Sequence, residues 1–264
     1  MRLKNKLTVI ILVALSLFSL TGCSNKKTSE DENNINATLA STTLSDMIYN
    51  SSQEINKGPT KTYGKIAYLT IDDGPSQYTD EMVKILKDNN VKATFFMIDG
   101  NMKSYPNQVK NALEAGNSIG FHSVSHDIHK LYKTPMSAKK EFDTCQKTFE
   151  IITGDTSILI RLPFGRKPYT SQASYDNIVN AGYKIWDWTL DTEDWKSTSP
   201  QIVQSIKQNA KGNEIVILIH ERKQTVAVLD QIIKYLKSQG YEIVPITQTQ
   251  EEQNYWNEKL GSQG

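Results

Sequence analysis

The sequence predicts an α/β fold in which parallel strands alternate with helices and close into a barrel. Short apolar runs recur along the chain, and most segments between them carry apolar residues at helical spacing. Strands that alternate with helices in this way form parallel sheets, and seven such units exceed what a small open sheet needs. Polar clusters also follow five of the runs. The loops after the strands of a parallel barrel open onto one face, so these clusters are expected to converge there.

Seven apolar runs are predicted to be strands: 66–71, 93–98, 118–121, 157–160, 183–188, 214–219 and 241–244. Helices are predicted between them over 135–152 and 171–181, and from the apolar stripes at 82–86, 109–113 and 226–236. Thr79 is expected to cap the first of these helices. Ser199 is expected to cap another helix, with Pro200 at its first helical position. Gly116 and Gly240 are expected to end helices.

The first 22 residues have the pattern of an export signal. Basic residues at positions 2, 4 and 6 precede an apolar stretch over 7–20, which is too short to span a bilayer comfortably. Leu20-Thr21-Gly22-Cys23 resembles a bacterial lipobox, which implies cleavage before Cys23 and a lipid on its sulfur. The alternative is a plain secretion signal in which Cys23 is incidental. We expect an exported protein, anchored through Cys23 to the outer face of the cytoplasmic membrane and facing the cell wall.

The rest of the chain divides by composition. Residues 23–62 are polar, with little apolar periodicity, and are expected to form a flexible tether. The folded domain is expected over 63–250, followed by a polar tail over 251–264. Cys145 falls on the apolar stripe of a predicted helix, so we expect a core residue there. The formal net charge of +1 gives no reason to expect nucleic-acid binding, and a monomer is expected.

Histidine and carboxylate residues cluster in a pattern that suits a metal. Three of the four histidines lie within eight positions, and His122 and His126 are four residues apart. Neutral imidazoles are the commonest metal ligands, although such a pair alone is also compatible with two ordinary histidines. Asp72-Asp73-Gly74-Pro75 supplies a carboxylate, although such acidic turns are often merely solvated. Two histidines and one carboxylate leave an open coordination position, the pattern of catalytic zinc.

The five polar clusters together resemble the motifs of the NodB-homology polysaccharide deacetylases, carbohydrate esterase family 4. In order they are Thr70-Ile71-Asp72-Asp73-Gly74, His122 to His126, Arg161-Leu162-Pro163-Phe164, Asp191 to Trp195, and Leu218-Ile219-His220. The resemblance covers about residues 65–244 and implies a distorted (β/α) barrel of seven or eight units. It implies metal-dependent hydrolysis of acetamido groups on N-acetylglucosamine residues of a cell-surface glycan. Peptidoglycan is the favoured substrate, because a surface-tethered enzyme meets it first.

The resemblance also implies roles on the metal side of the site. Asp73, His122 and His126 would hold one divalent metal, with Zn²⁺ expected and Co²⁺ or Ni²⁺ as alternatives. Asp72 would be the general base, and Arg161 would pair with it and keep it ionised.

Further roles are implied on the leaving-group side. His220 would be the general acid that protonates the amine, held in its cationic form by Asp191. The backbone N–H of Phe164 would help to stabilise the oxyanion, and Leu218 and Trp195 would wall the pocket for the acetyl methyl group. Glu193 and Asp194 are expected to be solvated, and no family role transfers to His129.

Two departures from the family pattern are visible, and the alternatives stay open. Ile71 replaces the usual Phe of the first motif, at a position expected to point into the core. Phe164 stands where Tyr is common.

Pro75 is typical of members that act on N-acetylglucosamine. A chitooligosaccharide or exopolysaccharide deacetylase remains the alternative within this chemistry, and a catalytically idle glycan-binding lipoprotein the alternative of another class.

Overall fold

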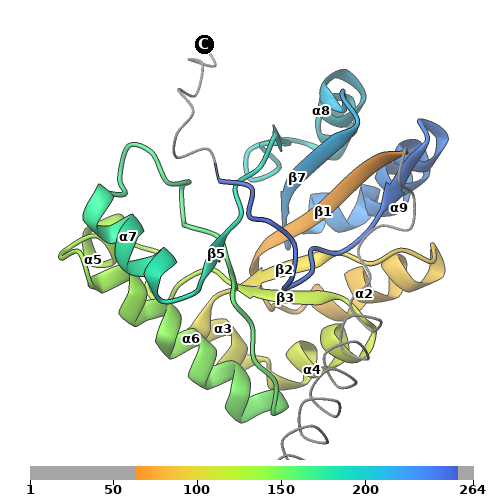
Figure 1. The fold of residues 1–264 in the computed structure, drawn as a ribbon. Coiled ribbons are helices and arrows are strands. Elements are labelled where there is room, and N and C mark those ends of the chain that lie inside the picture. Colours follow the sequence, from red (N-terminus) through yellow and green to blue (C-terminus); the bar gives the residue numbers. More distant parts are fainter. Residues whose placement is uncertain (1–63, 255–264) are drawn as a thin grey trace, which may run out of the picture. The chain divides into compact units, whose positions relative to one another are not determined.

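The computed structural model describes residues 64–254. Within them, eight parallel strands form one sheet in the order β5-β4-β3-β2-β1-β7-β6, with β8 also paired to β1 (Figure 1). The strands are β1 (Lys65–Gly74), β2 (Thr94–Met97), β3 (Ser118–Phe121), β4 (Leu159–Ile160), β5 (Lys184–Ile185), β6 (Leu190–Asp191), β7 (Glu214–His220) and β8 (Tyr241–Ile243). The predicted signal peptide, the predicted lipidation site Cys23, the predicted tether and positions 255–264 of the tail lie outside the described residues.

The long strand β1 organises the sheet. β7 runs along it from Ile66 to Asp72, β8 pairs with Lys65–Ala67, and β2 pairs with Thr70–Gly74. The parallel sheet is curled as a half-barrel. Its two end strands, β5 and β6, are not paired with each other among the described residues, so the barrel is open there. The predicted α/β class is confirmed, with the closure of the barrel incomplete.

Helices pack around the sheet (Figure 1). They are α2 (Thr79–Asp88), α3 (Asp99–Ser104), α4 (Pro106–Glu114), α5 (Ile128–Leu131), α6 (Ser137–Thr153), α7 (Gln172–Asn180), α8 (Ser199–Asn209) and α9 (Lys223–Ser238). The short elements α3, α5 and β6 have no counterpart in the sequence prediction, because four to six helical residues or two strand residues carry too little periodicity. Within residues 64–254, the helices are too short or too polar to span a membrane.

Two expected helix caps are displaced. Thr198, rather than Ser199, is the N-cap of α8 and forms a capping box with Gln201. α2 begins at Thr79 itself, after Tyr78, and Tyr78 makes no side-chain cap bond. The Thr79 hydroxyl instead bonds to Ser76 and to the carboxylate of Glu221.

Alternation along the strands divides the core into two layers. Ala67, Leu69 and Ile71 of β1 belong to the larger cluster, which the helices cover. Tyr68 belongs instead to a smaller cluster on the concave side of the sheet, where its ring meets Trp186 edge-on at 5.6 Å. Thr70 and Asp72 share the parity of Tyr68. The carboxyl end of β1 therefore continues the concave face, and Ile71 points into the core as expected.

The segment after β8 covers the concave core. Ile246 is buried in the smaller cluster, and the amide of Gln250 donates to the Tyr68 hydroxyl. Asp187 N donates to the carbonyl oxygen of Gln253. The folded domain therefore continues past position 250, at least to Asn254.

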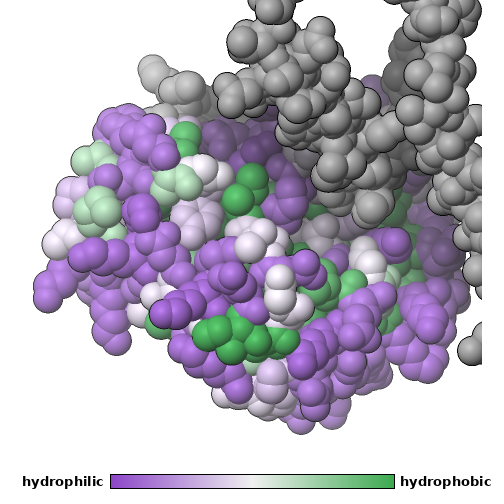
Figure 2. Space-filling model, turned by 60° about the horizontal axis from the view of Figure 1, so that its bottom comes forward, coloured by the Kyte–Doolittle hydropathy of each residue, from purple (hydrophilic) through white to green (hydrophobic). Residues whose placement is uncertain are grey.

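The face of the described residues that Figure 2 shows is mainly hydrophilic. On the face in Figure 2, hydrophobic residues form small groups separated by hydrophilic ones. Large exposed hydrophobic side chains in the described residues are Tyr105, Met136, Ile151, Phe164, Tyr169 and Trp195. Phe164, Tyr169 and Trp195 follow strands β4 and β6, on the carboxyl side of the sheet.

Candidate active site

A bulge in β1 turns two adjacent carboxylates toward one site. Asp72 pairs with Phe96 of β2 while Gly74 pairs with Met97, so Asp73 is an extra residue in the ladder. Its φ of 68° lies in the left-handed region, and Asn101 donates to its carbonyl oxygen at 2.7 Å. Successive strand residues normally face opposite sides, and a bulge re-aims a side chain. Asp72 and Asp73 therefore each place an oxygen 3.7 Å from Nε2 of His122.

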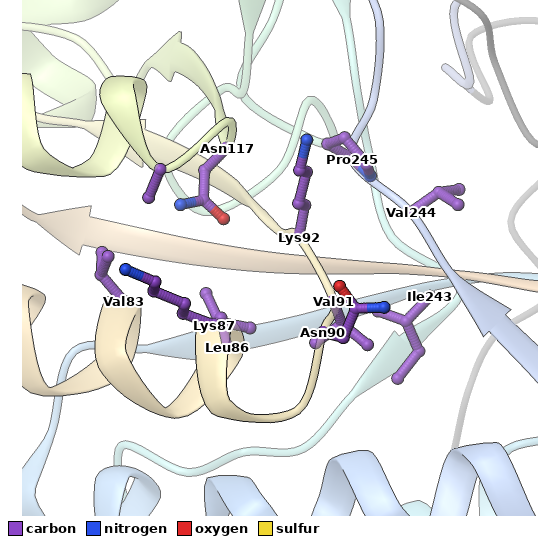
Figure 3. Close-up of a pocket in the computed structure, with 11 residues that line it drawn as sticks. Val83, Leu86, Lys87, Asn90, Val91, Lys92, Asn117, Ile243, Val244 and Pro245 are labelled. Atoms are coloured by element: carbon purple, nitrogen blue, oxygen red, sulfur yellow. The ribbon is translucent and has the colours of Figure 1, made fainter.

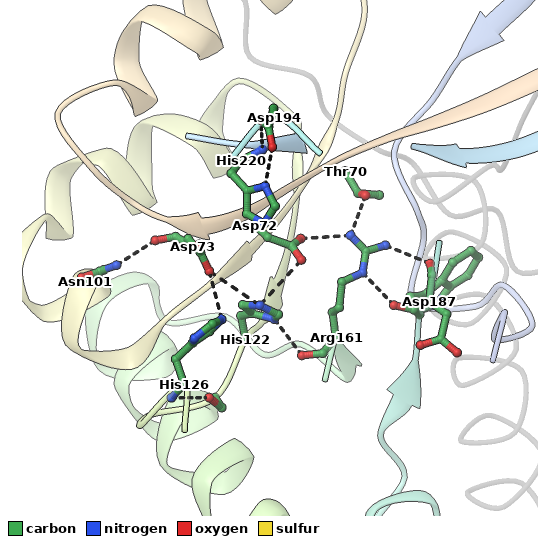
Figure 4. A network of polar contacts seen from close by, with 12 residues as sticks. Thr70, Asp72, Asp73, Asn101, His122, His126, Arg161, Asp187, Asp194 and His220 are labelled. Atoms are coloured by element: carbon green, nitrogen blue, oxygen red, sulfur yellow. Dashed lines mark hydrogen bonds and ion pairs between the residues drawn. The ribbon is translucent and has the colours of Figure 1, made fainter. Parts of the chain in front are cut away.

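The three predicted metal ligands converge. Asp73, His122 and His126 each offer one atom, and these atoms lie within 4.8 Å of one another. Asp73 Oδ1 is 3.3 Å from His126 Nε2 and 3.7 Å from His122 Nε2. Figure 4 draws both contacts as dashed lines. Ligands about 2.1 Å from a tetrahedral zinc stand about 3.4 Å apart. The spacing thus suits a metal of that size.

The state of His122 also suits a metal ligand. Nδ1 lies 2.9 Å from the carbonyl oxygen of Arg161. A carbonyl only accepts, so Nδ1 carries the proton, and the lone pair of Nε2 is available to bind a metal on the side where Asp73 lies. Burial lowers the pKa of His122 to about 3, which keeps the ring neutral.

The carboxylate oxygen between the histidines fits a cation. Asp73 Oδ1 is buried and accepts no hydrogen bond within the described residues. A buried anionic oxygen without such a partner is costly. A divalent metal would supply the missing contact, so the residues present fit the group.

Arg161 holds Asp72 from the concave core. Its guanidinium donates to Asp72 Oδ1 at 2.9 Å, to the Thr70 hydroxyl, and to the carbonyl oxygens of Trp186 and Asp187 (Figure 4). Both charged groups are essentially inaccessible to solvent. Burial raises the pKa of Asp72, and the charge of Arg161 opposes that rise.

His220 lies beside Asp72, but its carboxylate partner differs from the predicted one. Asp72 and His220 are in-register neighbours on β1 and β7. Nδ1 of His220 bonds to Asp194 Oδ1 at 2.6 Å, and the other oxygen of Asp194 accepts from His220 N and from the Thr225 hydroxyl. Asp194 is fully buried, so the expectation that it is solvated is wrong.

Asp191 is not the residue that contacts the His220 ring. It is an exposed residue at the end of β6, and its Oδ1 accepts from Glu193 N at 2.7 Å in a tight turn. Glu193 has a left-handed φ of 50°, and beyond this turn Asp194 lies against β7. The carboxylate that holds His220 is therefore Asp194, and the prediction that Asp191 does so is wrong. Glu193 itself is exposed and pairs with Lys196, as expected of a solvated residue.

Comparison with known proteins agrees with this geometry. The polysaccharide deacetylase family model matches residues 60–186. A peptidoglycan-N-acetylglucosamine deacetylase of Bacillus cereus is 38% identical over 201 residues, covering 72% of this chain and 73% of the relative. The chain belongs to the polysaccharide deacetylase family. Another enzyme of that name from Bacillus cereus is 34% identical over 197 residues, covering 70% of this chain and 87% of the relative.

A solved deacetylase has the same fold. The crystal structure of a polysaccharide deacetylase from Bacillus cereus superposes with a TM-score of 0.71 at 36% identity, covering 74% of this chain and 98% of that one. The half-barrel sheet is thus the fold of the deacetylase family.

The predicted pocket residues lie around the site of this deacetylase. The Phe164 ring is 4.7 Å from that of His126, on a backbone with a left-handed φ of 62°. Leu218 is buried in β7 on the same face as His220, and Trp195 is exposed in the loop after β6. A hollow of about 370 Å³ beside His126 is lined by Asp127, Ile128, Phe164 and Tyr169.

A second hollow lies away from the catalytic residues. It has a volume of about 240 Å³, and Figure 3 shows Lys87, Lys92 and Asn117 among its lining side chains. Its walls are the end of α2, the segments that lead into β2 and β3, and the segment after β8. The end of α2 and the segments that lead into β2 and β3 are at the amino ends of those two strands, whereas the active-site residues follow carboxyl ends.

The sequence analysis did not identify two acidic residues that support the active-site loops, the buried Glu221 and the partly buried Glu141. Glu221 accepts hydrogen bonds from Ser76 and Thr79, and a Cβ at Gly74 would stand 2.0 Å from its Oε1. Glu141 holds the histidine loop from α6. Glu221 is an acidic residue next to His220, and Glu141 is one on a predicted helix, so neither stands in a pattern that marks it as a support. For Asp194, the sequence offered one signal, which is its position in the fourth motif.

Proposed function

We propose that this deacetylase hydrolyses the acetamido group of N-acetylglucosamine residues in peptidoglycan, releasing acetate and leaving a free amine. The observation that carries the proposal is the convergence of Asp73, His122 and His126 beside two separately held groups, Asp72 on Arg161 and His220 on Asp194. The peptidoglycan preference draws on what the similar Bacillus cereus enzymes are named for.

The metal would be held by Asp73, His122 and His126, with Zn²⁺ proposed and Co²⁺ or Ni²⁺ as alternatives. When bound, it supplies a Lewis acid for the acetyl carbonyl and for the attacking water. The remaining chemistry belongs to the side chains of the chain.

Asp72 is proposed to take the proton of the attacking water. Its carboxylate is desolvated, which raises the pKa and strengthens it as a base, while Arg161 fixes its orientation. The water oxygen then bonds to the carbonyl carbon, and the Phe164 N–H would donate to the developing oxyanion.

His220 is proposed to give a proton to the leaving nitrogen as the carbon–nitrogen bond breaks. Burial alone lowers the pKa of His220, but the hydrogen bond with Asp194 and the charges of Asp72, Asp194 and Asp73 raise it above the ordinary value. The raised pKa favours the protonated ring, the form that a general acid requires. The proposed base Asp72 and the proposed acid His220 are paired across two neighbouring strands, whose backbones lie about 4.8 Å apart. This spacing suits two groups that act on the carbon and the nitrogen of one amide.

An idle glycan-binding role is less consistent with these contacts. A buried charge pair such as Asp72–Arg161 is costly to desolvate, and binding a neutral sugar needs neither it nor the His220–Asp194 pair.

We further propose that Cys23 carries a lipid and that the enzyme works at the outer face of the cytoplasmic membrane. The monomeric state stays a prediction.

The substrate is tested by acetate release from purified glycans. Intact peptidoglycan, peptidoglycan already de-N-acetylated at glucosamine, and chitin oligomers form the panel. The proposal expects acetate from the first, little from the second, and glucosamine residues in muropeptides by mass spectrometry. Equal acetate from the first two would place the reaction on muramic acid instead. Release from chitin oligomers alone would favour the alternative substrate.

A further inference from the structure

A carboxylate outside the candidate metal-ligand set holds the loop that carries both histidines. This loop runs from His122 to His126, after β3, and Glu141 lies in α6. The backbone N–H groups of Val124 and Ser125 both donate to Glu141 Oε2 at 2.9 Å. The Ser125 hydroxyl donates to Oε1 at 2.8 Å. Glu141 thus binds the middle of the loop, between the two histidines.

The loop has a conformation that needs external support. Ser123 and His126 have φ values of 72° and 46°, in the left-handed region. For residues other than glycine such a conformation costs roughly 1–3 kcal/mol and persists where neighbours enforce it. Inside the loop, His126 N donates to the Ser123 hydroxyl at 3.1 Å. Asp99 N, at the start of α3, donates to the Ser123 carbonyl oxygen at 3.1 Å. Glu141 adds side-chain contacts from the long helix α6, at the residues between the two histidines.

The two histidines differ in how firmly they are held. The His122 side chain is 4% exposed and is tied to the carbonyl oxygen of Arg161. The His126 side chain is 30% exposed, and its ring contacts Phe164, itself exposed. The direction of His126 therefore depends mainly on the backbone of its own loop. A change in that backbone would move Nε2 away from Asp73.

We propose that Glu141 is a positioning residue for the metal site, acting through the backbone of Val124 and Ser125 to keep His126 turned toward Asp73. The proposal rests on the metal site proposed above. Hydrogen bonds to an ionised carboxylate are about twice as strong as neutral ones, so a carboxylate suits the role. Glu141 touches neither metal nor substrate, and its effect is on affinity for the metal.

The test measures zinc affinity and apo-protein stability in the purified full chain. Zinc affinity comes from competition with a chromophoric chelator, and stability from thermal unfolding in excess chelator. The variants are Glu141→Ala and Glu141→Gln. The matched control is Glu150→Ala, because Glu150 is an exposed acid farther along the same helix.

Glu141→Ala should weaken zinc binding by about 10–100-fold, the usual effect of losing a group that orients a ligand. Glu141→Gln should weaken zinc binding less than Glu141→Ala does. The glutamine oxygen can still accept from the two backbone N–H groups, and its amide nitrogen can donate to the Ser125 hydroxyl. Glu150→Ala should bind zinc as wild type does. As apo-proteins, Glu141→Gln and Glu150→Ala should unfold close to the wild-type temperature, because glutamine keeps the acceptor for the two backbone N–H groups.

Wild-type zinc affinity in Glu141→Ala would overturn the proposal. So would a loss explained entirely by unfolding of the apo-protein and not eased by glutamine, since that marks a structural role alone. If Glu141→Ala does not fold, Glu141→Gln decides: weaker zinc binding at an unchanged unfolding temperature supports the proposal, and unchanged affinity refutes it. Absence of zinc binding in the wild type would instead refute the metal site itself.

Discussion

The fourth motif shows how one residue's surroundings decide its role. Asp191 and Asp194 are both aspartates of one short loop, but Asp191 is exposed whereas Asp194 is buried and accepts from the His220 ring, the His220 backbone and the Thr225 hydroxyl. The motif alone does not tell which carboxylate returns to the histidine. In the structure the chain turns at Glu193, which has a left-handed φ, and Asp194 after this turn bonds to the His220 ring.

Asp194→Asn should shift the alkaline limb of the pH–rate profile to lower pH. Asp194 contributes to raising the pKa of His220, so without its charge the ring loses its proton at a lower pH and the general acid is lost earlier. Asp191→Asn is the matched control and should leave the limb almost in place. The measurement is initial acetate release across pH. A shift in the Asp191 variant with none in the Asp194 variant would restore the original assignment.

Asp72→Asn should reduce acetate release by about two to four orders of magnitude, the usual worth of one positioned base. The asparagine oxygen can still accept from Arg161, and Asp73, His122 and His126 are unchanged, so zinc content should stay near wild type. Metal analysis and single-turnover rates check both points. Near-normal rates in this variant would mean that another group is the base.

At the scale of elements, the sequence predicted well what periodicity and motifs encode. β3 has the predicted bounds, and β1 and β7 contain the predicted runs. The bulge at Asp73 could not be read in this way, because it depends on where β2 pairs with β1. The supports from Glu141 and Glu221 are likewise contacts between elements far apart in the sequence, and a single sequence does not specify such pairs.

Gly74→Ala should disturb the carboxylate turn. A Cβ there would stand 2.0 Å from Oε1 of Glu221, which is buried and held by Ser76 and Thr79. Crowding of this kind typically destabilises by about 1–3 kcal/mol, and the shift should also weaken zinc binding because Asp73 is adjacent. Thermal unfolding and chelator competition measure the two effects.

The control for this prediction is Gly100→Ala. A Cβ at Gly100 meets nothing within 4 Å, and in α3 alanine should stabilise by about 0.5–1 kcal/mol. If Gly74→Ala matched this control in stability and zinc affinity, the close packing of Glu221 against the turn would have no consequence.

At the scale of the whole molecule, the proposed anchor determines where the enzyme meets its substrate. Cys23→Ala should abolish labelling by a fatty-acid analogue and release the protein from the membrane fraction or stall its processing, because two acyl chains are what give stable anchoring. Metabolic labelling followed by fractionation checks this. Labelling that persists in the variant would place the lipid elsewhere, while Cys145, which is buried in α6, is no candidate.

Deacetylation is proposed to require one divalent metal, held by Asp73, His122 and His126. The most direct test of this requirement is acetate release from intact peptidoglycan by the purified chain before chelation, after chelation, and after zinc is restored. We expect full loss of acetate release after chelation and recovery with zinc in the wild type, and no recovery in His126→Ala. Acetate release that continues unchanged in the chelated, metal-free enzyme would show that the metal is not required.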